Sequence, residues 1–167
     1  MMHRLEIRDE APADVPGIRI VHAAAFPTHA EADLVDHDQL RRDGSAVYSL
    51  VAGSDERVVG HAMFSRMELP EGSLGMAPVA VLESHRGRGL AARLIREGLA
   101  KAKADGWKSV FVLGDPYYTR FGFDPRLAEG FASPYAGPHF MALELQAGAF
   151  TAAAGDARYA KAFAALG

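Results

Sequence analysis

The alternation of apolar and polar residues along the chain predicts six β-strands. Some segments, such as 5–8, alternate with the period of two expected of a strand with one buried face. Others, such as 109–113, are short apolar runs typical of a strand buried on both faces. The predicted strands cover residues 5–8, 46–52, 57–65, 74–82, 109–113 and 140–145.

Helical spacing of apolar residues predicts the helices between these strands. Asp14 is the expected N-cap of a first helix, which Pro27 ends. In the longest helix, which starts at Leu90, apolar residues share one face, charged residues lie elsewhere, and Asp105-Gly106 ends the pattern. The predicted helices cover residues 14–25, 30–42, 90–104 and 157–166.

The connections predict a mixed sheet with helices on its faces, an α/β (α+β) fold. Residues 53–56 have the length and composition of a hairpin turn, so the strands beside them are antiparallel. The long helix after the strand at 74–82 is a crossover and makes the next pair parallel. Pro78 removes a hydrogen-bond donor from that strand, which indicates a bulge or a separation from its neighbour.

Composition and charge exclude several classes of protein. The 167 residues are 49% hydrophobic and 23% charged, which predicts one globular domain over residues 1–167. A net charge of −3 argues against a protein that coats a nucleic-acid duplex, because such a protein carries an excess of basic residues. No apolar run is long enough to span a membrane. The charged N-terminus lacks the apolar region of a signal peptide, so a cytoplasmic protein is expected. The absence of cysteine excludes disulfides, zinc–thiolate sites and a cysteine nucleophile.

A glycine-rich turn before the longest helix favours an anion-binding site. Backbone N–H groups at a helix N-terminus, glycines that allow close approach, and two arginines together suit a diphosphate. The turn is not a Walker A loop, and it lacks the third glycine of a dinucleotide-binding motif. A tight turn with two solvated arginines is the alternative. The segment consists of Arg86, Gly87, Arg88, Gly89, Leu90 and Ala91.

This segment resembles the Gln/Arg-x-x-Gly-x-Gly/Ala signature of the GNAT superfamily of acetyl-CoA-dependent N-acyltransferases at each fixed position. Residues 117–123, Tyr-Tyr-Thr-Arg-Phe-Gly-Phe, are similar to a second element of that superfamily, and residues 113–123 resemble a bacterial branch of it. The resemblance spans essentially the whole chain. It implies a mostly antiparallel sheet with splayed central strands, and direct attack of an amine on acetyl-CoA in a ternary complex.

The resemblance also implies site residues. Main-chain groups of the strand at 79–81 would hold the pantetheine arm and the thioester carbonyl, and Tyr118 would be the general acid to the leaving sulfur. Packing beside Phe121 and Phe123 is the alternative for Tyr118. The expected coenzyme-binding residues are Val79, Val81, Arg86, Gly87, Arg88, Gly89, Leu90, Ala91, Tyr117 and Phe121.

The general base has two candidates, Glu31 and His61. Glu31 lies three residues after Thr28, so it also fits a helix capping box. A histidine ordinarily has a pKa near neutral pH, which makes His61 a candidate, but a lone strand histidine is more often a satisfied core residue. The histidines lack the spacing of metal ligands, and we predict no metal site.

The implied co-substrate is acetyl-CoA, with CoA as product, and the implied acceptor is a small-molecule or peptide amine. A non-catalytic acyl-CoA sensor is the alternative function. A homodimer stays open, since dimers are frequent in the superfamily. Nucleic-acid binding through the arginines of the turn and helix is disfavoured by the acidic net charge.

Overall fold

The computed structural model describes residues 5–26, 44–54, 57–150, 155–161 and 163. Its main sheet has the strand order β1-β2-β3-β4-β5-β7, and each neighbouring pair is antiparallel except β4–β5. Each predicted strand is confirmed to within one residue at either end. The bounds are β1 Glu6–Asp9, β2 Ala46–Gly53, β3 Val58–Arg66, β4 Ser73–Val81, β5 Ser109–Leu113 and β7 Phe140–Glu144.

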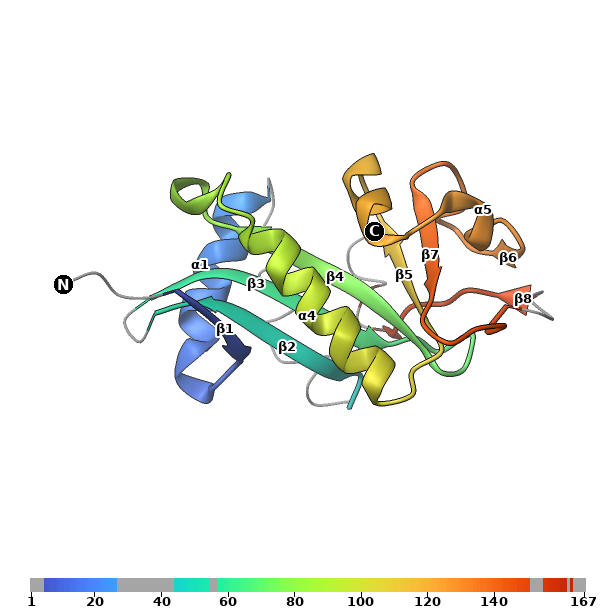
Figure 1. The fold of residues 1–167 in the computed structure, drawn as a ribbon, viewed down its shortest axis with the longest axis horizontal. Helices are drawn as coiled ribbons and strands as arrows, with labels where there is room; N and C mark the ends of the chain where they lie inside the picture. The colour runs from blue at the N-terminus through green and yellow to red at the C-terminus, as the bar shows by residue number, and fades with distance from the viewer. Residues whose placement is uncertain (1–4, 27–43, 55–56, 151–154, 162, 164–167) are drawn as a thin grey trace.

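Two helices cover opposite faces of this sheet (Figure 1). Helix α1, Val15–Ala25, lies on the face to which β3 directs His61, whose ring contacts His22. Helix α4, Leu90–Ala104, lies on the other face, where the Phe64 ring rests on Gly98. The alternation along β3 therefore gives each helix its own set of apolar contacts, and the predicted helices on both faces are confirmed.

Short elements complete the chain. Residues 131–132 and 155–156 pair in parallel as a small second sheet. The described helical turns and short strands are η1 Pro12–Asp14, η2 Glu83–His85, η3 Pro116–Phe121, α5 Pro125–Ala128, β6 Phe131–Ala132 and β8 Gly155–Asp156.

The sheet opens between its two parallel strands. Pairing of β4 with β5 runs only from Ser73–Ser109 to Gly75–Phe111, after which the strands diverge (Figure 1). On its other side β4 carries a bulge, because the register with β3 shifts between the partners of Ala62 and Phe64. Pro78 lies in this bulge and beyond the last residue of β4 that pairs with β5. The bulge and the separation from a neighbouring strand that Pro78 indicates are therefore both found.

Some local expectations differ from the structure. Asp14 precedes α1 but its carboxylate caps no helical N–H; it binds Arg8 and the Ala11 N–H instead. The helix expected over 157–166 is wrong for residues 157–160, since Arg158 pairs with Leu69 in an extended bridge and helical turn geometry is found only at Lys161 and Phe163 among the described residues of this segment. The reason is tertiary, because Tyr159 packs its ring on Gly75 and an extended backbone brings it there. The helix expected over 30–42 lies outside the described residues.

Candidate functional site

The glycine turn after β4 presents backbone N–H groups at the start of α4. Gly87 and Gly89 have φ of +78° and +74°, in the left-handed region that favours glycine. The Gly89 carbonyl accepts the first helical bond, from Arg93 N at 3.0 Å. No side chain among the described residues caps this end, so the N–H groups of the first turn, including those of Leu90 and Ala91, face outward at the positive end of the helix dipole.

The two arginines of the turn have different surroundings. Arg86 Nε donates to the Val81 carbonyl at 3.1 Å, which ties the turn to the end of β4. Arg88 lies between the two glycines, and both arginine side chains are exposed. An anion at the turn therefore meets N–H donors, a helix dipole and two guanidinium groups together.

The strand leading to this turn has free main-chain groups on one edge. Leu82 N donates to Val59 O at 2.8 Å, and hydrogen-bonded pairs alternate along an antiparallel ladder. The amides of Val79 and Val81 therefore face away from β3, into the gap where β5 has diverged. The Val81 carbonyl also faces away from β3, since it accepts a hydrogen bond from Arg86 Nε.

A cavity of about 520 Å³ lies where the strands separate. It contains Val79 and Tyr118 from the expected site, and its remaining lining is mostly apolar and aromatic. Free amides of β4 thus lead from the glycine turn to the cavity. The lining residues are Phe26, Met76, Ala77, Pro78, Val79, Leu113, Tyr118, Tyr135, Tyr159 and Phe163.

Tyr118 is held in the cavity by η3 and by a glycine. Asp115 accepts from Tyr117 N at 2.7 Å, which caps η3 at its start. A Cβ at Gly114 would lie 2.7 Å from the Tyr118 ring, so the ring occupies the space that a side chain there would fill. Burial, with smaller contributions from Tyr117 and Asp115, raises the pKa of Tyr118. Its phenol therefore keeps its proton at neutral pH and can donate it.

Aromatic contacts join η3 to α4. The rings of Tyr117 and Phe121 meet edge to face at 5.4 Å, and the Arg96 guanidinium of α4 lies over Phe121 at 5.2 Å. The Arg120 guanidinium lies over the Tyr117 ring, 4.0 Å from the ring centroid. These contacts position η3 beside the helix that begins at the glycine turn.

The two candidate bases are placed differently. Glu31 lies outside the described residues. His61 is fully buried in β3, with Nδ1 2.8 Å from His22 Nε2 and Nε2 2.7 Å from Ser49 Oγ. It does not line the cavity, so it can act on an amine there only through other groups.

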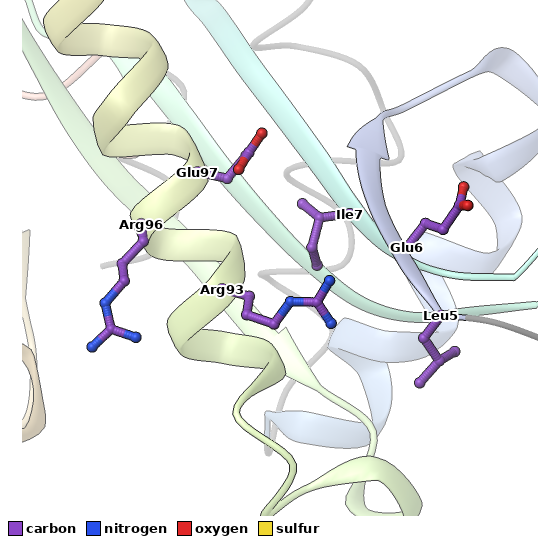
Figure 2. Close-up of a pocket in the computed structure, with 6 residues that line it drawn as sticks. All are labelled: Leu5, Glu6, Ile7, Arg93, Arg96 and Glu97. Carbon is purple, nitrogen blue, oxygen red and sulfur yellow. The ribbon is translucent and has the colours of Figure 1, made fainter.

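A second hollow lies between β1 and α4 (Figure 2). It measures about 580 Å³, and Figure 2 shows Arg93 extending from α4 toward Ile7 while Arg96 leaves the other side of the helix. Its walls carry Glu6 and Glu97 as well as the arginines. Carboxylates and guanidinium groups share this hollow, so the site is better placed at the turn and the cavity. In the part of the chain that the structure describes, no cluster of three metal-binding side chains and no membrane-spanning helix is found.

Comparison with known proteins agrees with this site. The sequence model of the Acetyltransferase (GNAT) family matches residues 13–123, from before α1 through η3. The chain belongs to the GNAT family of acetyltransferases. Both sequence motifs and the expected fold are thereby confirmed, and the protein is an enzyme of the acyltransferase class.

Two curated relatives of Escherichia coli K12 carry N-acetyltransferase names. The uncharacterized N-acetyltransferase YhbS is 46% identical over 123 residues, covering 71% of this chain and 72% of the relative. The uncharacterized N-acetyltransferase YjhQ is 36% identical over 147 residues, covering 82% and 80%.

Two solved structures share the fold along almost the whole chain. The Escherichia coli YhbS structure in complex with CoA has a TM-score of 0.89 at 37% identity, covering 100% of this chain and 96% of that one. A GNAT family acetyltransferase from Brucella melitensis in complex with acetyl-CoA has a TM-score of 0.78 at 35% identity, covering 97% and 99%.

Part of the cavity could not be found from the sequence. Phe26, Tyr135, Tyr159 and Phe163 line it from segments far apart in the chain. None belongs to a local motif. The one sequence signal is Gly75, because a glycine inside a strand often marks the close approach of another group.

Proposed function

We propose that this protein transfers an acetyl group from acetyl-CoA to a primary amine of a small molecule or peptide, by direct attack in a ternary complex. The observation that carries the proposal is the placement of main-chain N–H groups that face away from β3 and out of α4, those of the glycine turn and those of Val79 and Val81, which lead to the cavity holding Tyr118. The CoA and acetyl-CoA complexes of the two similar structures support it. We also infer that residues 1–167 form one domain, since both helices pack on one core.

The residues present fit the coenzyme. The turn at 86–91 would take the diphosphate, because its N–H groups and exposed arginines match phosphate oxygens. The free edge of β4 would bind the amides of the pantetheine arm through main-chain hydrogen bonds, in the way that it would bind an added strand. Tyr117 and Phe121 lie beside α4, where they would contact the arm. When bound, the coenzyme supplies an activated acyl group as a thioester.

The chemistry divides between a main-chain donor and a phenol. The Val79 N–H, which faces the cavity side of β4, would stabilise the oxyanion formed when the amine attacks. Tyr118, which burial keeps in its protonated form, would donate its proton to the departing sulfur. No cysteine exists in the chain, so no acyl-cysteine intermediate forms. Glu31 and His61 stay hypotheses for the removal of the amine proton.

The test is thiol release from acetyl-CoA, measured with a thiol-reactive dye. The chain has no cysteine, so the protein itself gives no background. Butylamine, phenethylamine, spermidine and an alanine-initiated peptide are used as acceptors, and calorimetry measures CoA binding. Binding with amine-dependent thiol release is expected. Binding without release for every acceptor would favour an acyl-CoA sensor instead. Absence of heat with CoA would overturn the proposal.

A further inference from the structure

One side of the cavity is a wall of aromatic rings from segments far apart in the chain. Tyr135 follows β6, while Tyr159 and Phe163 belong to the segment after β8. The Tyr135 and Tyr159 rings meet edge to face, with centroids 5.6 Å apart and planes at 70°. Tyr159 and Phe163 follow at 5.5 Å. These three rings form one continuous surface, the aromatic wall.

The aromatic wall stands at the end of the gap that is remote from the glycine turn. A Cβ at Gly75 would lie 2.5 Å from the Tyr159 ring, so this ring rests directly on β4. Gly75 is also the last residue of β4 that pairs with β5. Val79, the proposed oxyanion donor, lies four residues further on, at most roughly 13 Å along an extended strand. A group on the wall and an amine at the thioester therefore need only a short linker between them.

The cavity is larger than an acetyl group needs. Its volume is about 520 Å³, whereas the share of one water molecule in the liquid is roughly 30 Å³. Cavities of about 300–1,000 Å³ hold whole small ligands. Direct attack brings the acceptor to the carbonyl that the Val79 N–H would bind, so the acceptor has to enter this same cavity. The space that the acetyl group leaves is therefore assigned to the acceptor.

The chemistry of the lining favours an aromatic ring in that space. Half of the ten described lining residues are aromatic, and the other half are apolar. Burial raises the pKa of both Tyr118 and Tyr159, so these phenols stay neutral at neutral pH. Aromatic rings gain from edge-to-face contact beyond the area that they bury. An aromatic group gains both terms here, while an aliphatic group of the same size gains burial alone.

We propose that the acceptor is a primary amine joined by a short linker to an aromatic ring, and that Tyr135 and Tyr159 determine this specificity by packing on that ring. The inference rests on the proposed acetyl transfer and names its acceptor class. Tyr118 and Val79 line the same cavity, so an amine held in this way reaches the groups proposed for the chemistry. 

The transfer balances for such an acceptor. The nitrogen of the neutral amine forms a bond to the acetyl carbon, and the C–S bond breaks. The sulfur leaves as a thiol with the proton of Tyr118. The nitrogen loses one proton as the amide forms, and this proton replaces the one that Tyr118 gave up.

The acceptor class is tested with three amines that differ only in the group they carry. Thiol release from acetyl-CoA is measured with phenethylamine, 2-cyclohexylethylamine and butylamine, and kcat/KM is expressed on the neutral amine because the ring lowers the amine's own pKa. Phenethylamine should exceed butylamine at least tenfold and 2-cyclohexylethylamine at least threefold. Butylamine within threefold of phenethylamine, or an equal rate with 2-cyclohexylethylamine, would overturn the proposal.

The specificity residues are tested by removing one ring at a time. Tyr135→Leu and Tyr159→Leu should each lower the preference for phenethylamine over butylamine at least fivefold, chiefly by raising KM for phenethylamine. KM for acetyl-CoA should stay within twofold. A ratio of two amines on one enzyme is insensitive to a loss of folded protein, so a purely structural role would leave it unchanged.

Tyr48→Leu is the matched control. Tyr48 packs edge to face on Phe64 and donates to Asp105, and it does not line the cavity. Its replacement should leave the preference unchanged. An unchanged preference in both Tyr135→Leu and Tyr159→Leu, or an equal change in Tyr48→Leu, would overturn the assignment of the two residues.

A long acyl chain is the competing occupant of the same space. Hexanoyl-CoA is therefore compared with acetyl-CoA, with butylamine as acceptor. Acetyl-CoA should be used at least tenfold better in wild type. Equal or better use of hexanoyl-CoA would assign the aromatic wall to the donor and overturn the proposal.

Binding without turnover separates this inference from the proposed function. Ligand-observed NMR measures the Kd of phenethylamine and of butylamine for the protein alone and with CoA added. The Kd of phenethylamine should be at least tenfold lower, and Tyr135→Leu should remove most of the difference. If wild type releases no thiol with any amine, the proposed function fails, and the NMR result decides on the aromatic site. Equal Kd values for the two amines would overturn the inference even if acetyl transfer is found.

Discussion

Replacing Gly89 by alanine should weaken coenzyme binding through the backbone alone. Gly89 has φ +74°, and a Cβ there would meet nothing within 4 Å, so crowding plays no part. An L-residue in this region costs about 1–2 kcal/mol. For a domain of this size that corresponds to a fall in Tm of roughly 2–8 °C. If the backbone instead relaxes to negative φ, the N–H groups of the turn rotate away from the phosphate.

The effect on affinity follows from the lost donor. A hydrogen bond to a charged group is worth about 1.5–3 kcal/mol, which is roughly a 10- to 150-fold increase in Kd. Calorimetry with CoA measures this change, and thermal unfolding measures the fall in Tm.

The chain offers a matched control at the other end of the same helix. Gly106 has φ +88°, and a Cβ there would also meet nothing within 4 Å, but this glycine lies beyond the C-terminus of α4. Gly106→Ala should lower Tm by a similar amount and leave the Kd for CoA unchanged. If Gly89→Ala binds CoA within twofold of wild type, or if both variants weaken binding equally, the assignment of the turn to the diphosphate is refuted.

Three further outcomes are expected. Tyr118→Phe should lower kcat about 10- to 100-fold without abolishing turnover, because a thiol of pKa near 8.5 is already a fair leaving group; full kcat would remove Tyr118 from the mechanism. Gly114→Ala places a Cβ 2.7 Å from the Tyr118 ring and should lower kcat about tenfold, with little further loss in a Tyr118→Phe background, which a double-mutant cycle measures. The pKa of His22 is lowered to about 4 by burial, so the unfolded chain binds its proton first and the free energy of unfolding should fall by about 3 kcal/mol between pH 6.5 and 4. Urea unfolding of wild type against His22→Gln checks this, and an equal slope in both would count against it.

Most of the fold could be predicted because local patterns encode it. The strands follow from alternation and the two long helices from apolar spacing. Pro78 marked the place where the sheet opens, since proline lacks the N–H that a continuous ladder needs and is confined to bulges and strand edges. The glycine turn could be recognised for a similar reason, as its conformation needs particular residues at particular positions.

The parts that could not be predicted depend on contacts between distant segments. The sequence predicts a helix over 157–166, but Tyr159 is placed by Gly75, far away in the sequence. In the sequence His61 is a lone histidine, because nothing local connects it to His22 or Ser49, although the structure places both within hydrogen-bond distance of its ring. The expectation that it is more often a satisfied core residue described its burial well. It did not show that the hydrogen bonds continue to Glu10.

The proposed mechanism divides its work between backbone and side chains, and this division has a measurable consequence. In it, coenzyme binding relies on N–H groups oriented by Gly87, Gly89 and the free edge of β4, which side-chain truncation leaves in place. The proposed acid chemistry relies on Tyr118, whose removal leaves those N–H groups untouched. Backbone variants should therefore change Kd first and Tyr118 variants kcat first. The reverse pattern, a changed kcat from the turn and a changed Kd from Tyr118, would mean that the two halves of the site have been assigned the wrong way round.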